Sequence, residues 1–81
     1  MKISGYENSD VQADEIKFMD LAEITIEAMP EELRKIAQFF VDVAEKMETM
    51  ESSYSHEHLA DNQSGFEGSP HVTVFNSNNV K

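Results

Sequence analysis

The densest group of chemically versatile side chains lies in the sequence HEHLAD, residues 56–61. In an extended segment His56 and His58 point the same way, so the two imidazoles could share a zinc or nickel ion. Asp61 or His71 would then supply a third ligand. The spacing matches no closed structural zinc site, and the chain has no cysteine to complete one. Two such histidines serve equally well for hydrogen bonds that order a loop. We therefore favour a structural or interface role for this segment and expect no cofactor.

The sequence carries no recognisable signature of an enzyme. It has no Gly-rich phosphate loop and no nucleophile elbow, and HEH lacks the second histidine at the spacing of a zinc-protease helix. A histidine beside a carboxylate can act as a general acid or base, but nearly every protein offers such a pair. We predict a non-enzymatic function with no catalytic residues.

One long amphipathic helix must position this segment, and it is predicted over residues 30–51. Pro30 suits the first helical position, where its fixed φ helps and its missing N–H costs nothing. Apolar residues recur at helical spacing and form a stripe that should face a core. The residues of this predicted stripe are Leu33, Ile36, Ala37, Phe40, Val43, Ala44 and Met47.

The apolar arc of this helix is wider than one covering surface requires, because Phe39, Val41 and Met50 lie at its rims. Two explanations are open. The segment after the helix folds back over one rim, or a partner helix packs there in a homodimer. Phe39, Val43 and Met50 are the candidate residues for either kind of packing.

Three strands are expected around the helix, at residues 2–6, 16–28 and 71–75. The second of these alternates apolar and polar residues, which is typical of a half-buried strand. Its polar side carries Glu23 and Glu27, which would form an acidic strip. The first two strands can pair as an antiparallel hairpin, and the third can return to the same sheet.

The remaining segments complete a small α+β fold. Residues 52–70 are rich in Ser, Asn and Gly and are predicted to form an irregular loop, and residues 76–81 a polar tail. At 81 residues the chain suits a single domain. We predict the order β-β-α-β, with a three-stranded sheet packed on one amphipathic helix.

Net charge limits the partners. The chain has 16 acidic and 6 basic residues, giving a net charge of −10. Such a charge repels nucleic-acid phosphates and attracts basic protein surfaces, although acidity for solubility alone is the alternative. No signal-peptide core and no apolar run of membrane-spanning length is present in the sequence, so we expect a soluble cytoplasmic protein without membrane contact.

Several motifs resemble immunity protein family 32, which is found beside toxins in bacterial polymorphic toxin systems. The matching positions are residues 23–26 (EITI), residues 30–32 (PEE), HEH at 56–58 with Asp61, and PHVTV at 70–74. The resemblance extends over roughly two-thirds of the chain and excludes residues 1–20. It implies a binder that neutralises a cognate toxin by stoichiometric association, without catalysis.

On this reading, the candidate contact residues are Glu23, Glu27, His56, Glu57, His58 and Asp61. A basic toxin surface would suit the acidity of the chain. Two other functions remain open. One is a small homodimeric scaffold or regulator, which a neighbouring toxin gene would argue against. The other is a metal-binding or ligand-binding module built on HEHLAD, which would retain about one metal equivalent per chain.

Overall fold

Helix α1 (Pro30–Met50) is the longest element of the computed structural model, which describes residues 1–7 and 18–78. It confirms the helix predicted over residues 30–51. Met29 precedes it with an extended backbone (φ −81°, ψ 157°), as the residue before a proline requires. The Met29 N–H donates a 2.8 Å hydrogen bond to the Glu32 carboxylate, which fixes the entry into the first turn.

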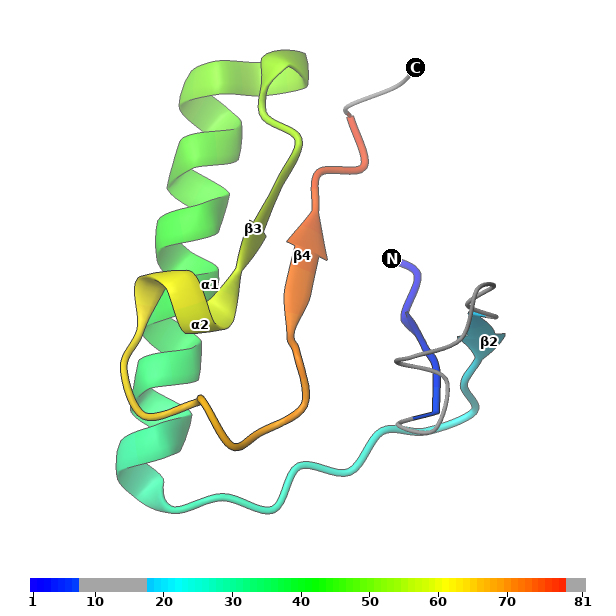
Figure 1. Ribbon diagram of the computed structural model, residues 1–81. Helices are drawn as coiled ribbons and strands as arrows, with labels where there is room; N and C mark the ends of the chain where they lie inside the picture. Colours follow the sequence, from blue (N-terminus) through cyan, green and yellow to red (C-terminus); the bar gives the residue numbers. More distant parts are fainter. Residues whose placement is uncertain (8–17, 79–81) are drawn as a thin grey trace.

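The other elements are short and precede or follow α1 along the chain (Figure 1). Strands β1 (Ser4–Gly5) and β2 (Met19–Asp20) precede it and pair antiparallel, which confirms the predicted pairing of the first two strands. After α1 come η2 (Glu51–Ser53), β3 (His56–His58), α2 (Leu59–Asn62) and β4 (Thr73–Phe75). Neither α-helix of the described chain combines the length and apolarity needed to cross a membrane.

The prediction of one three-stranded sheet is wrong. The described residues form two separate two-stranded sheets, β1–β2 and β3–β4. The difference arises because β4 pairs antiparallel with β3, placing His56 opposite Phe75 and His58 opposite Thr73. Strand β3 and helix α2 lie within residues 52–70, so the prediction that this whole stretch is irregular is also wrong.

The prediction of a half-buried strand over residues 16–28 is wrong for most of its length. Residues 16 and 17 lie outside the described residues, and β2 accounts for two residues of the remainder. Residues 23–28, which we call the arm, are extended but belong to neither sheet. Ile24 and Ile26 of the arm are 50% and 56% exposed, so the described part of the chain covers them only in part.

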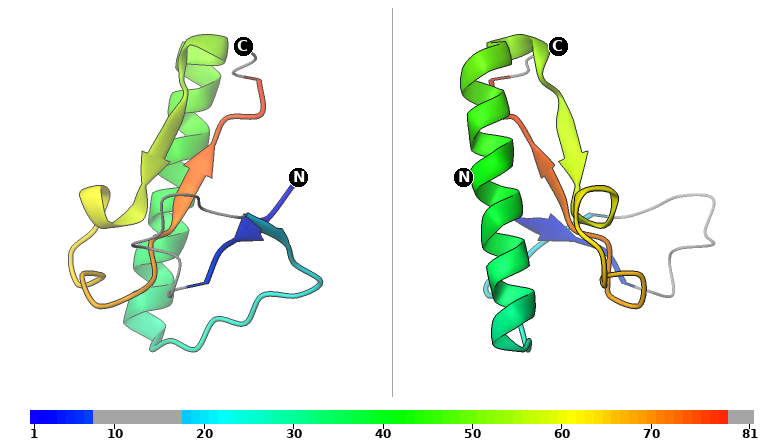
Figure 2. Two further views of the ribbon diagram at one scale, coloured as in Figure 1. Left: turned by 45° about the vertical axis from the view of Figure 1, so that its right-hand side comes forward. Right: turned by 90° about the vertical axis from the view of Figure 1, so that its left-hand side faces the viewer.

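The core forms where the segment after α1 folds back over the helix (Figure 2). Its buried apolar residues are Phe39, Val43, Tyr54, Leu59 and Phe66, with Ile36, Met47, Val72 and Val74 packed against them. Antiparallel β3 and β4 lie over one side of α1, and α2 closes the end of this layer. The fold-back therefore supplies the second half of the core.

The buried face of α1 is turned relative to the predicted stripe. Phe39, predicted at the rim, is 1% exposed, whereas Phe40 from the centre of the stripe is 47% exposed. Val43 and Met47 lie on both the predicted and the observed faces. Met50, the third residue proposed for packing, is about half exposed at the end of the helix.

Candidate functional site

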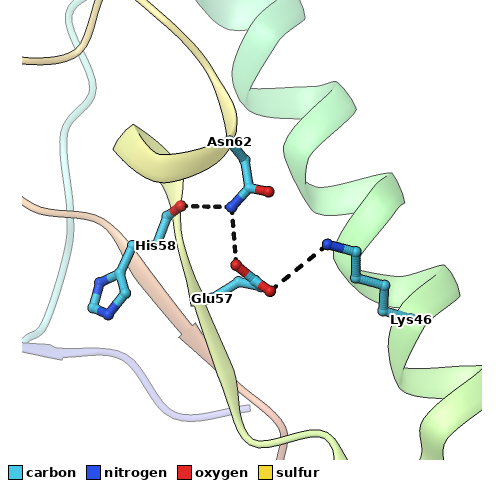
Figure 3. A network of polar contacts seen from close by, with 4 residues as sticks. All are labelled: Lys46, Glu57, His58 and Asn62. Atoms are coloured by element: carbon cyan, nitrogen blue, oxygen red, sulfur yellow. Dashed lines mark hydrogen bonds and ion pairs between the residues drawn. The ribbon is translucent and has the colours of Figure 1, made fainter.

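Strand β3 turns the side chains of the HEH motif to opposite sides of the β3–β4 sheet. Successive residues of a strand alternate between its faces. Glu57 therefore points toward α1, where its side chain reaches Lys46, while His56 and His58 lie on the face away from the helix. The motif divides into an inner carboxylate and two outer imidazoles; Figure 3 shows Glu57 and His58 on their opposite sides.

Glu57 is the centre of a polar network that joins three elements (Figure 3). Its carboxylate lies 3.6 Å from the Lys46 ammonium on α1. On the other side, the Asn62 side-chain amide donates a 3.0 Å hydrogen bond to Glu57 Oε2 and a 2.8 Å hydrogen bond to the His58 carbonyl. Asn62 thereby binds the end of α2 to the strand that precedes it.

This network shifts two pKa values in opposite directions. The hydrogen bond from Asn62 is the main cause that lowers the pKa of Glu57; partial burial opposes it, and Lys46 adds to it. Burial is the main cause that raises the pKa of Tyr54, and the negative charge of Glu57 contributes. The buried Tyr54 hydroxyl has no hydrogen bond of good geometry within the described chain, so its contact with Glu57 is a loose one.

The outer face of the sheet, formed by His56, His58, Thr73 and Phe75, is aromatic and accessible. The His56 ring stacks on Phe75 with centroids 4.8 Å apart and planes at 25°, and the His58 ring meets His56 edge-on at 5.2 Å. Thr73 Oγ1 lies 3.0 Å from His58 Nδ1. Phe75 is 67% exposed. Aromatic rings with polar edges are favoured in protein interfaces.

A metal site receives little support from this geometry. His56 and His58 share the outer face, but the described residues contain no group of three or more His, Cys, Asp or Glu side chains placed to hold an ion. His71 precedes β4, and Asp61 is exposed on α2. Each imidazole also has its Nδ1 within 3.0 Å of a hydroxyl, Ser55 for His56 and Thr73 for His58.

The acidic candidates lie in a different part of the molecule. Glu23 and Glu27 are both exposed on the arm, which runs from β2 to the start of α1 (Figure 1). Among the hydrogen bonds, ion pairs and ring contacts of the described residues, none joins the arm to the outer face. The structure thus brings the histidines together with each other and leaves the two arm glutamates apart from them.

Sequence reasoning missed Asn62 and Asn76, whose side chains order the segment around the site. Asn76 is 6% exposed, and its amide donates hydrogen bonds to the carbonyls of Glu51 (2.8 Å) and Tyr54 (2.9 Å). Both asparagines stand in stretches rich in polar residues. The acceptors of Asn76 lie more than 20 residues away along the chain, so no local pattern reveals them. The acceptors of Asn62 are only four and five residues away, but they belong to a strand that the sequence did not predict.

The comparisons with known proteins now bear on this geometry. A family model described as immunity protein 32 matches residues 23–78. The chain belongs to the immunity protein 32 family. The matched region begins at the arm and contains α1, both strands of the β3–β4 sheet and the network around Glu57, whereas β1 and β2 precede it. Searches of curated proteins and of solved structures gave no match.

Membership confirms the resemblance inferred from the short motifs. All four matching segments of the sequence, including HEH at residues 56–58 and PHVTV at residues 70–74, fall inside the matched region. For an immunity protein 32 domain, the family description suggests a role in neutralising a toxin.

Proposed function

We propose that this chain neutralises a cognate toxin by binding to it directly, as a stoichiometric and non-catalytic partner. The observation that carries the proposal is the match to the immunity protein 32 family over residues 23–78. The exposed aromatic outer face and the strong acidity of the chain support it, because both suit a protein interface.

The proposed binding surface has two parts with different roles. His56 and Phe75 of the outer face supply contact area, since their stacked rings combine apolar faces with polar edges. The exposed carboxylates of Glu23, Glu27 and Asp61 supply negative charge. His58 lies half-buried beside His56 and holds the outer face in shape through Thr73.

Glu57 belongs to the candidate contacts but has a different position from the others. Its carboxylate is turned toward α1 and is bound by Lys46 and Asn62. We assign it the role of holding β3 and α2 against the helix, so that His56 and Asp61 are presented in fixed positions. Its replacement would then weaken toxin binding through the shape of the site.

Electrostatics should govern how quickly the complex forms. A net charge of −10 on 81 residues creates a negative field that steers a basic partner toward the surface and raises the association rate. The proposed partner is a toxin with a basic surface, such as the nucleic-acid groove of a nuclease. Added salt should slow association because it screens this field.

The test uses the product of the adjacent gene as the candidate toxin and measures binding kinetics at two salt concentrations. The double variant Glu23→Lys with Glu27→Lys should bind roughly tenfold or more weakly, about 1.4 kcal/mol or more, mainly through slower association. Glu48→Lys with Glu45→Lys is the matched control, because both residues are exposed on α1 and the charge change is the same. Equal loss in both double variants would show that net charge matters and the arm does not. Unchanged affinity in the arm variant would refute the assignment of Glu23 and Glu27.

The outer face is tested separately with Phe75→Ala. Phe75 is 67% exposed, so its removal should leave folding intact while reducing affinity and the protection of cells that express the toxin. A variant that keeps full affinity would exclude this face from the interface. An absence of binding between the wild-type chain and the toxin would refute the proposed function as a whole.

A further inference from the structure

The arm has the sequence pattern of a strand but has no strand to pair with in the described chain. In a strand Ile24 and Ile26 would lie on one side of it, and Glu23, Thr25 and Glu27 on the other. Within the described residues, no backbone hydrogen bond is made by residues 23–28. Both isoleucines are half exposed. An extended, alternating and uncovered segment of this kind is suited to join the edge of a sheet.

The start of α1 fixes Met29, the residue that follows the arm. Met29 is fixed by its position before Pro30 and by two hydrogen bonds: its N–H donates to Glu32 at 2.8 Å, and its carbonyl accepts from the Leu33 N–H at 3.0 Å. The arm leaves the first turn and runs across to β2 without joining the β3–β4 sheet, as all three views in Figures 1 and 2 agree.

Strand β4 offers an open edge to such an arm. The Leu59 N–H donates to the Val72 carbonyl, the Asn76 N–H donates to the Ser55 carbonyl, and Val74 is opposite Glu57. The backbone groups of Val72, Val74 and Asn76 therefore face β3. Because backbone groups alternate along a strand, those of Thr73 and Phe75 face away from β3, and they are unpaired within the described residues.

The opposite edge of the sheet is partly closed. On β3, the backbone groups of His56 and His58 face away from β4 by the same alternation. The His58 carbonyl already accepts a 2.8 Å hydrogen bond from Asn62. Helix α2 thus protects the β3 edge, and the β4 edge is the one at which an added strand would find free donors and acceptors.

We propose that two copies of the chain exchange arms, with the arm of each copy adding to β4 of the other as a third, antiparallel strand. One register places the β-branched residues of the arm opposite those of β4. It places Thr25 opposite Thr73, Ile24 opposite Val74 and Ile26 opposite Val72. In the same register Glu27 lies opposite His71 and Glu23 opposite Phe75. Thr–Thr pairs stabilise sheets, and β-branched residues fit the pleated surface of a strand.

We take the partner to be a second copy of the chain, because every copy carries both an unpaired arm and an open β4 edge. The arm of one copy and the β4 edge of the other form one contact, and the two-fold operation repeats it, as in a closed exchange between protomers. The arm and β4 both lie within the region matched by the family model, residues 23–78. In this arrangement Ile24 and Ile26 extend the apolar inner face that Val72 and Val74 already form against the core.

The absence of cysteine from the sequence allows a direct test by disulfide trapping. Thr25→Cys and Thr73→Cys are made in separate chains, refolded together and oxidised, and the products are separated without reductant. Opposed residues of a hydrogen-bonded antiparallel pair have Cα atoms about 5.5 Å apart, which suits a disulfide. We expect a cross-linked dimer of the mixture and none of either variant alone. Thr25→Cys mixed with Thr49→Cys, an exposed threonine on α1, is the matched control and should stay monomeric on the gel.

Light scattering on the unmodified protein gives the second measurement and needs no toxin, so its failure is distinct from a failure of the proposed function. We expect twice the chain mass of 9.2 kDa, and a return to the single mass in Ile26→Asp, whose side chain lies outside the core. Because two chains of charge −10 repel, added salt should strengthen this dimer.

Three results would overturn the proposal. The first is a monomer at all concentrations with no cross-link in the mixture. The second is an intramolecular disulfide in a chain that carries both Thr25→Cys and Thr73→Cys, with no cross-link in the mixture of single variants. The arm would then pair with β4 of its own chain. The third is a dimer that persists unchanged in Ile26→Asp, because another surface would then hold it.

Discussion

Replacing Asn76 with alanine should destabilise the fold more than replacing any other polar residue near the carboxyl end of the chain. Asn76 follows β4 directly and is 6% exposed. Its side-chain amide binds the carbonyl of Glu51, just after α1, and that of Tyr54, just before β3. Its side-chain oxygen accepts from the Asn78 N–H at 3.1 Å. One side chain thus connects the end of α1 with both strands of the sheet.

The expected loss of stability follows from the hydrogen bonds that the substitution removes. The Asn76→Ala substitution removes two hydrogen bonds to carbonyls, and a net contribution of about 0.5–1.5 kcal/mol each gives a loss of roughly 1–3 kcal/mol in the free energy of unfolding. For a chain of 81 residues, each kcal/mol lowers Tm by about 4–8 °C. A fall of roughly 10 °C is therefore expected. The backbone bond from the Asn76 N–H to Ser55 remains, so the sheet should still form.

Thermal and urea unfolding, monitored by circular dichroism at a single protein concentration, measure this loss of stability. Asn78→Ala is the matched control, since Asn78 is exposed and contributes its backbone N–H to the contact. Its stability should stay within about 0.5 kcal/mol of the wild type. Asn76→Asp should cost more than Asn76→Ala, because a carboxylate facing two carbonyls replaces donors with repulsion. Equal stability of Asn76→Ala and Asn78→Ala would refute the role assigned to Asn76.

Two further predictions concern the same half of the molecule. Glu51 has a positive φ of 53° with ψ of −132°, a conformation that is costly for any side chain, so Glu51→Gly should raise the free energy of unfolding by up to about 1 kcal/mol. The control Glu48→Gly, inside α1, should lower the free energy of unfolding by about that amount. Destabilisation by both substitutions would contradict backbone strain at Glu51. The pKa of Glu57 is lowered from its ordinary value of 4.5, so the contribution of its charged form to stability is complete above pH 4.5 and is lost as the pH falls through the lowered value. The stability difference between wild type and Glu57→Gln should therefore shrink on acidification, as measured by urea titrations from pH 6 to pH 3. The stability difference between wild type and the exposed control Glu67→Gln should stay small throughout. If the difference for Glu57→Gln is constant with pH, the charge of Glu57 is not its cause.

The local features of this protein could be predicted from its sequence because they depend on neighbours along the chain. The helical period and Pro30 located α1 to within a residue or so. Alternation located β4 within residues 71–75, and a short strand predicted at residues 2–6 contains β1. The motifs around HEH were sufficient to infer the family, which the match over residues 23–78 confirms.

The tertiary structure determined which face of α1 is buried. Phe39 and Phe40 are adjacent on α1, and either could be buried by an apolar arc that spans both. The segment from β3 to β4 packs on the side of Phe39 and leaves Phe40 exposed. The prediction for residues 52–70 failed for a related reason: β3 has three residues, too few for a periodic signal, and it is stabilised by β4 from a distant part of the chain.

The candidate site shows the same division. The sequence by itself determined that two imidazoles and two carboxylates cluster within residues 56–61. The tertiary structure decided that Glu57 faces Lys46 and that His56 stacks on Phe75. Strand pairing sets which side chains lie opposite one another, and it is a contact between distant residues. The arm is the clearest case, because its sequence alternates as a strand does, while the described residues give it no strand to pair with.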